Sequence, residues 1–312
     1  MKKSLKQEMA AGYGLTDWRG NGLPEGYFPH WEYNVYGNFM EERFKRMFTN
    51  GSGSELDFKG AAIHSSSMFS YNFFHWINSD TTTSVELPDY DKPIKLSYVG
   101  FEARLKTLPS SNAPANIDVV LLSEDEEDLL LIESKLLEYN AHSAFDISNS
   151  YANCEKYYVR GEDWSEFIKS CRQKYVERGH YYEGLKQNIC HLIAIQNLAT
   201  KEEKAVKAKD WFREHNGELK KIDLSKIQRY HFINAVFDPN SKFEYERECF
   251  KDYKNLQEGF REELMNNNLI PENLTVSFME YSHFWKQFKA NMPEDIEAFL
   301  NRRYMQFGAA EE

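Results

Sequence analysis

The sequence contains no hydrophobic run near the roughly 20 residues that a membrane-spanning helix needs, and no apolar stretch follows the lysines of residues 1–10. A secretory signal requires such a stretch. The four cysteines, Cys154, Cys171, Cys190 and Cys249, are widely spaced and lack the CxxC arrangement of zinc sites and redox pairs. We therefore expect a cytoplasmic protein with reduced thiols and no membrane contact.

Positive charge is also scarce, since 38 Lys and Arg against 49 Asp and Glu give a net charge of −11. A protein that coats nucleic acid non-specifically needs a surplus of cations to neutralise phosphates, so the charge argues against that class. An enzyme that confines its positive charge to one cleft stays open, because its acidic residues include those that hold metal ions.

The chain is long enough to bury a large core. Its 312 residues, of which 41% are hydrophobic and 15% aromatic, predict one elaborated domain with a well-packed interior. The composition suggests an irregular N-terminal arm at 1–34, a core at 35–285 with an insertion at 140–179, and a C-terminal helix at 286–312.

The pattern of apolar residues predicts alternating helices and strands. Three apolar segments with short polar turns between them, at 94–108, 116–122 and 129–139, indicate an antiparallel meander. Helices are expected at 38–48, 164–175, 181–198 and 243–265, a solvated helix with a loop at 201–221, and further strands at 230–237 and 274–281. This order predicts an α/β (α+β) fold with a central mixed sheet flanked by helices.

Two charges interrupt the third strand of the meander. Because alternate residues of a strand share a face, Glu133 and Lys135 should lie on the face of Leu129, Leu131 and Leu137. The opposite face would carry Leu130, Ile132, Ser134 and Leu136. Burying charges among leucines costs several kcal/mol unless each is paired or binds an ion, so this pattern indicates a functional site rather than a surface salt bridge.

Asp118 interrupts the preceding strand in the same way. A short loop joins the two strands, so Asp118 is expected beside Glu133, where the two carboxylates repel unless a cation lies between them. Mg²⁺ (or Mn²⁺) suits this pair as metal ligands, because hard cations prefer oxygen donors and keep several waters. Lys135 would orient or deprotonate the attacking water, or stabilise charge that builds on phosphorus.

Asp118 followed by Glu133-Ser134-Lys135 resembles the PD-(D/E)xK nuclease superfamily. The segments 64–74, 101–102 and 132–138 are similar to bacterial uncharacterised restriction-endonuclease-like proteins within it, and the likeness covers about residues 35–285. It implies a restriction-endonuclease-like αβββαβ core, extended here by a C-terminal helix-strand-helix, with a divalent metal, hydrolysis of nucleic acid, above all DNA, and a homodimer as one expected form. Ile117 stands where the superfamily often has proline, a position that varies.

The resemblance also implies a further acid at the site and contacts from the helix after the third strand. Glu102 is the preferred acid and Glu42 the reserve, although a Glu102–Arg104 strand pair explains Glu102 equally well. Lys186 and Gln187 are the residues expected to bind substrate from the helix. Gln187 shares a face with His191, for which a satisfied core histidine is the simpler reading.

Ser66 and Asn72 lie in a polar and aromatic segment that follows His64. No acid completes a catalytic triad there, so we expect a loop that shapes the cleft or binds phosphate through Ser66 and Asn72. The aromatic clusters at 69–76 and 157–164 are expected to pack in the core rather than stack on bases. The alternative to a nuclease is a catalytically silent module that binds nucleic acid or protein, which the acidic balance favours.

Overall fold

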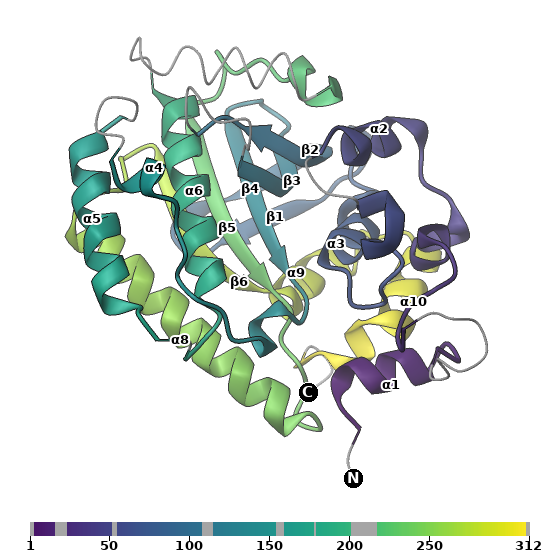
Figure 1. Cartoon of the computed structure of the whole chain (residues 1–312). Helices are drawn as coiled ribbons and strands as arrows, with labels where there is room; N and C mark the ends of the chain where they lie inside the picture. The colour runs from purple at the N-terminus through teal and green to yellow at the C-terminus, as the bar shows by residue number, and fades with distance from the viewer. Residues whose placement is uncertain are drawn as a thin grey trace.

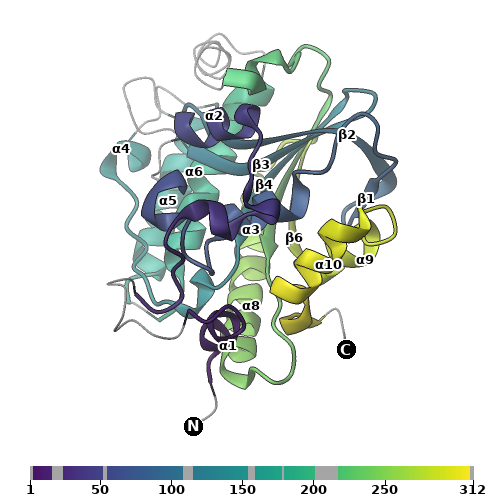
Figure 2. The same ribbon diagram turned by 90° about the vertical axis from the view of Figure 1, so that its right-hand side faces the viewer.

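The computed structural model describes residues 3–15, 24–51, 55–107, 115–153, 159–177, 179–200 and 217–309. A six-stranded mixed sheet forms the centre of this part of the chain (Figure 1). Seen after a quarter turn, helices lie against both faces of the sheet (Figure 2). The predicted mixed α/β architecture is therefore confirmed. No helix among the described residues is long and apolar enough to cross a membrane.

The six strands pair in the order in which they follow one another in the chain. They are β1 (Ser84–Leu87), β2 (Tyr90–Leu105), β3 (Ala115–Ser123), β4 (Asp128–Lys135), β5 (Arg229–Val236) and β6 (Leu274–Glu280). Pairing is antiparallel from β1 to β4 and parallel from β4 to β6. The predicted meander is confirmed as β2–β3–β4. The short strand β1 was not predicted, because its four residues follow a polar stretch and precede Pro88.

Helices connect the parallel strands, as parallel pairing requires a long crossover. The chain from β4 to β5 includes α4 (Asn149–Ala152), α5 (Gly161–Lys174) and α6 (Tyr182–Ala199), and α8 (Glu244–Asn266) leads from β5 to β6. The helices before the sheet are α1 (Leu5–Ala11), α2 (Glu42–Asn50) and α3 (Ser66–Phe74), and those after it are α9 (Tyr281–Phe288) and α10 (Glu294–Arg303). Short helical turns are η1 (Trp31–Asn34), η2 (Tyr36–Asn38), η3 (Glu55–Lys59), η4 (Glu138–Asn140), η6 (Gly217–Lys221) and η7 (Met305–Phe307).

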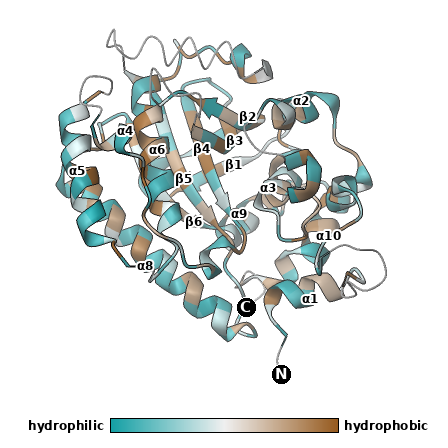
Figure 3. Ribbon diagram, in the orientation of Figure 1, coloured by the Kyte–Doolittle hydropathy of each residue, from teal (hydrophilic) through white to brown (hydrophobic). Residues whose placement is uncertain are grey.

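Two hydrophobic cores lie on the two faces of the sheet. The first core is formed by helices α1, α2, α3, α9 and α10 on one face of the sheet. The second core is formed by α5 and α6, with part of α8, on the other face. Apolar residues concentrate on the central strands, while the outward sides of α5 and α8 are hydrophilic (Figure 3). Burial of these two apolar layers fixes the sheet between its helices.

Several predicted elements differ from the structure. The arm at 1–34 contains the helix α1, which begins with a capping box of Ser4 and Gln7 and is tied to α8 by the Leu5 amide, 2.8 Å from Glu246 Oε1. The expected loop at 64–72 is largely the helix α3, whose residues after Ser66 are all buried, so its sequence lacks the polar face that reveals a helix. The C-terminal helix is two helices, and residues 201–216 of the predicted solvated helix lie outside the described part.

Candidate active site

Four polar residues form one row across four adjacent strands of the sheet. The pairs Phe101–Val119 and Ala103–Ile117 place Glu102 of β2 opposite Asp118 of β3. Val119 pairs with Ile132, so the next position sets Asp118 opposite Glu133 of β4, which in turn pairs with Asn234 of β5. Residues opposite one another on antiparallel strands share a face. The strand register therefore places Asp118 next to Glu133, as the sequence predicts.

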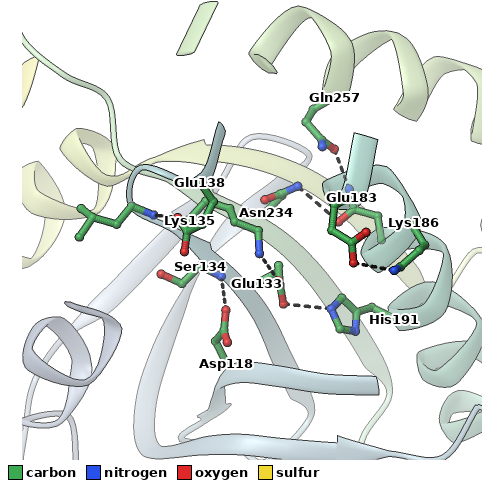
Figure 4. A network of polar contacts seen from close by, with 12 residues as sticks. Asp118, Glu133, Ser134, Lys135, Glu138, Glu183, Lys186, His191, Asn234 and Gln257 are labelled. Atoms are coloured by element: carbon green, nitrogen blue, oxygen red, sulfur yellow. Dashed lines mark hydrogen bonds and ion pairs between the residues drawn. The ribbon is translucent and has the colours of Figure 1, made fainter. Parts of the chain in front are cut away.

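Glu133 is held between two basic side chains inside the protein (Figure 4). Its Oε1 lies 2.5 Å from Lys135 Nζ, and its Oε2 lies 2.9 Å from His191 Nε2 of α6. All three residues are at most 5% exposed. Burial by itself would raise the pKa of Glu133, but Lys135 and His191 together lower it to about 2. Although burial disfavours the ammonium, Glu133 holds the pKa of Lys135 well above its ordinary value, so both groups are charged near neutral pH.

Strand β4 presents its residues as the sequence predicts, up to its end at Lys135. Leu129 and Leu131 pack in the second core, whereas Leu130, Ile132 and Leu136 pack in the first. Ser134 also faces the first core, where its hydroxyl lies 2.8 Å from the Tyr281 hydroxyl. Leu137 was expected beside Leu129 but packs in the first core, because the strand has ended and the alternation no longer holds.

Asp118 is partly buried and is fixed by the backbone of the neighbouring strand. The Ser134 amide donates to Asp118 Oδ2 over 2.7 Å. Burial and the nearby Glu133 carboxylate raise the pKa of Asp118 well above its usual range, against the opposing effect of Lys135. Two neighbouring acids thus have pKa values displaced in opposite directions, a pattern common at functional sites.

Glu102 occupies a strained backbone position at the same row. Its φ is 52°, in the left-handed region that a residue with a side chain rarely adopts. Phe101 packs in the first core and Ala103, two residues later, in the second, so the strand exchanges its faces at Glu102. Burial, with repulsion from Glu55 and Glu133, raises the pKa of Glu102 to about 8, although Asn116 donates to its carboxylate. The acid therefore lies at a boundary between the two cores.

A layer of buried amides continues the site toward α8. Asn188 of α6 donates to Gln257 Oε1 over 2.6 Å, and the amide of Asn234 lies 3.4 Å from both Asn188 Oδ1 and the Tyr253 hydroxyl. Sequence reasoning missed this layer and the contact of His191 with Glu133. Asn234 could have been noticed, because it interrupts the apolar run of Phe232, Ile233, Ala235 and Val236.

The residues expected to bind substrate do not all gather at the row. Lys186 is paired with Glu183 over 2.6 Å at the side of α6 (Figure 4). Gln187 precedes His191 by one turn, and its buried Oε1 has no hydrogen-bond partner among the described residues. Ser66 lies partly buried in the first turn of α3. No contact places it beside the carboxylates in the described part of the chain.

Asn72, by contrast, is an internal structural residue. It is fully buried, its Oδ1 accepts from the Tyr36 amide over 2.8 Å, and its Nδ2 donates to the Asn34 carbonyl over 2.9 Å. A side chain satisfied in this way has no surface for a substrate. Glu42, the reserve acid, is exposed at the start of α2, whereas Glu102 lies opposite Asp118 in the strand register.

One family of proteins matches nearly the whole chain. Residues 13–305 match the family described as REase-ARP, Restriction Endonuclease associating with ARP. No curated protein and no solved structure matches the chain.

Proposed function

The chain belongs to the REase-ARP family of restriction-endonuclease-like proteins, and we propose that it is a metal-dependent endonuclease of the PD-(D/E)xK type that hydrolyses DNA. The observation that carries the proposal is the row of Glu102, Asp118 and Glu133 with Lys135 beside it. Two buried acids and a partly buried one at the same place cost free energy, which a purely structural role would not offset. The elements α2, β2, β3, β4, α6 and β5 follow one another in the order expected of an αβββαβ core, with α3, β1, α4 and α5 between them, which supports the proposal.

The donor set fits a hard divalent cation. Three carboxyl groups, of which Asp118 and Glu102 have raised pKa values, stand near one ammonium and one imidazole. Among the described residues no three acidic, histidine or cysteine side chains converge to enclose an ion. Asp118 and Glu133 alone would suffice for Mg²⁺, which keeps several waters and takes only one or two carboxylates. A bound Mg²⁺ or Mn²⁺ would polarise the phosphate and lower the pKa of a water.

The protein's own residues would supply the remaining chemistry. Lys135 is positively charged in its pairing with Glu133, which supports a role in orienting the water or stabilising charge on the phosphate rather than accepting a proton. Asp118 Oδ2 accepts from the Ser134 amide, so Oδ1, for which the described residues supply no hydrogen bond, is the oxygen that would act as a ligand. Glu102 adds negative charge beside Asp118 when it loses its proton.

A silent binding module is the alternative, and one observation favours it. Both carboxylate oxygens of Glu133 already contact basic groups, so Lys135 balances the charge of Glu133 without a metal ion. The family description also names association with ARP, which would make that component a partner of this chain. A homodimer remains a further proposal for an enzyme that cuts both strands.

Cleavage assays on the full chain separate these functions. Supercoiled plasmid, linear duplex and RNA are incubated with Mg²⁺ or Mn²⁺ and with wild type, Glu133→Gln or Glu124→Gln, the last being a matched change at the exposed β3–β4 turn. We expect Glu133→Gln to lose on the order of 10²-fold or more of the activity while Glu124→Gln keeps it. Equal cleavage by Glu133→Gln and wild type would refute the nuclease, and metal-dependent cleavage of RNA alone would change the substrate.

A further inference from the structure

His191 is the residue at the site whose surroundings are least explained by the fold. It lies on α6 with its side chain almost fully buried, and its ring packs 5.8 Å from the Phe232 ring. Nε2 lies 2.9 Å from Glu133 Oε2, whereas the buried Nδ1 has no hydrogen-bond partner among the described residues. A histidine kept for packing alone would have its nitrogens satisfied, since unpaired buried polar groups cost free energy.

The two basic neighbours of Glu133 come from different elements. Lys135 contacts Oε1 from two residues further along β4, and His191 contacts Oε2 from α6 across the second core. With one oxygen held from the strand and the other from the helix, rotation of the carboxylate is restricted. Glu133 Oε2 is otherwise without a hydrogen-bond partner in the described part of the chain.

We propose that His191 is a positioning residue that holds Glu133 Oε2 and thereby fixes the direction in which Oε1 is offered to a divalent cation. This inference rests on the proposed function of the same site. Partners of metal-ligating groups typically change metal affinity 10- to 100-fold when they are removed. Loss of His191 should therefore weaken metal binding and raise the metal concentration needed for half-maximal cleavage, with a smaller effect on the rate at saturating metal.

The first readout is calorimetric titration of the apoprotein with Mn²⁺, which does not depend on activity. His191→Leu, which has no donor, is compared with His191→Gln, whose amide can reach the position of Nε2. His180→Leu is a matched change at an exposed histidine before α6. We expect His191→Leu to bind Mn²⁺ about 10- to 100-fold more weakly, His191→Gln to recover most of the affinity, and His180→Leu to bind as wild type does.

Binding by His191→Leu at wild-type affinity would overturn the inference. If His191→Leu does not fold, the comparison of His191→Gln with His191→Asn takes its place, because the asparagine amide is one methylene too short to reach Glu133 Oε2. Equal Mn²⁺ affinities of these two variants would then overturn the inference. Glu133→Gln separates the two proposals. If it binds Mn²⁺ as wild type does, the proposed function fails, whereas if it loses binding and His191→Leu does not, only the role of His191 fails.

Discussion

Replacing Glu102 with glutamine tests whether burial of this acid lowers the stability of the metal-free protein. Glu102 is 5% exposed, the pKa of its carboxyl is raised from 4.5 to about 8, and burial is the largest cause. An acid with a raised folded-state pKa binds more protons in the native protein than in the unfolded chain. Stability should therefore fall as pH rises between about 4.5 and about 8.

The size of this effect follows from the shift. Each pH unit inside the window costs at most ~1.4 kcal/mol, so wild type should lose about 2 kcal/mol between pH 6 and pH 8 through Glu102 alone. Glutamine keeps the shape of the side chain and does not titrate. Glu102→Gln should accordingly gain about 2 kcal/mol over wild type across the same interval.

Urea unfolding in the presence of a chelator measures this difference. Both proteins are unfolded at pH 6 and pH 8, with Glu42→Gln, a matched change at an exposed acid on α2, as the control. The control should show a pH response like that of wild type. A difference between Glu102→Gln and wild type that is the same at both pH values would refute the reasoning, because it would mean that Glu102 does not gain a proton in the folded state.

Two further substitutions follow from the same electrostatics. Lys135→Met leaves Glu133 buried with one basic partner fewer, so we expect the unfolding free energy to fall by ~3–5 kcal/mol and cleavage to be lost. Urea unfolding at pH 7 measures the first effect, and a variant as stable as wild type would contradict the pairing of Lys135 with Glu133. Asp128 accepts from Arg229 and His231, which hold its pKa at about 2 against the opposing effect of burial. Its stabilisation is present above about pH 4 and is lost as pH falls through 2, so Asp128→Asn should cost ~1–2 kcal/mol at pH 7 and roughly a third of that at pH 2.5.

The strands and the acids on them could be predicted because their signals are local. In β4 the alternation of leucines assigns Glu133 and Lys135 to one face, and the short turn to β3 sets the register that brings Asp118 opposite. Both inferences need only the two-residue period of a strand and a short connection. Glu102 was predicted less firmly, since a Glu–Arg strand pair explained it equally.

The remaining features depend on tertiary structure that no local pattern encodes. His191 reaches Glu133 only because α6 packs over β4 after a crossover of more than forty residues, and a lone helical histidine gives no sign of that contact. The exchange of faces at Glu102 depends on one positive φ in a residue that is not glycine. Helix α3 was missed because burial on every side removes the periodic pattern that identifies a helix.

Thermal unfolding with and without Mg²⁺ tests most directly whether the buried acids hold a divalent cation. At pH 8, wild type and Asp118→Asn are heated with chelator alone and with millimolar Mg²⁺. An ion that binds only the native state stabilises it by about 2.7 kcal/mol at one hundred times its dissociation constant, so wild type should unfold at a higher temperature with Mg²⁺ and Asp118→Asn should not. An equal shift in both proteins, or none in wild type, would contradict the account.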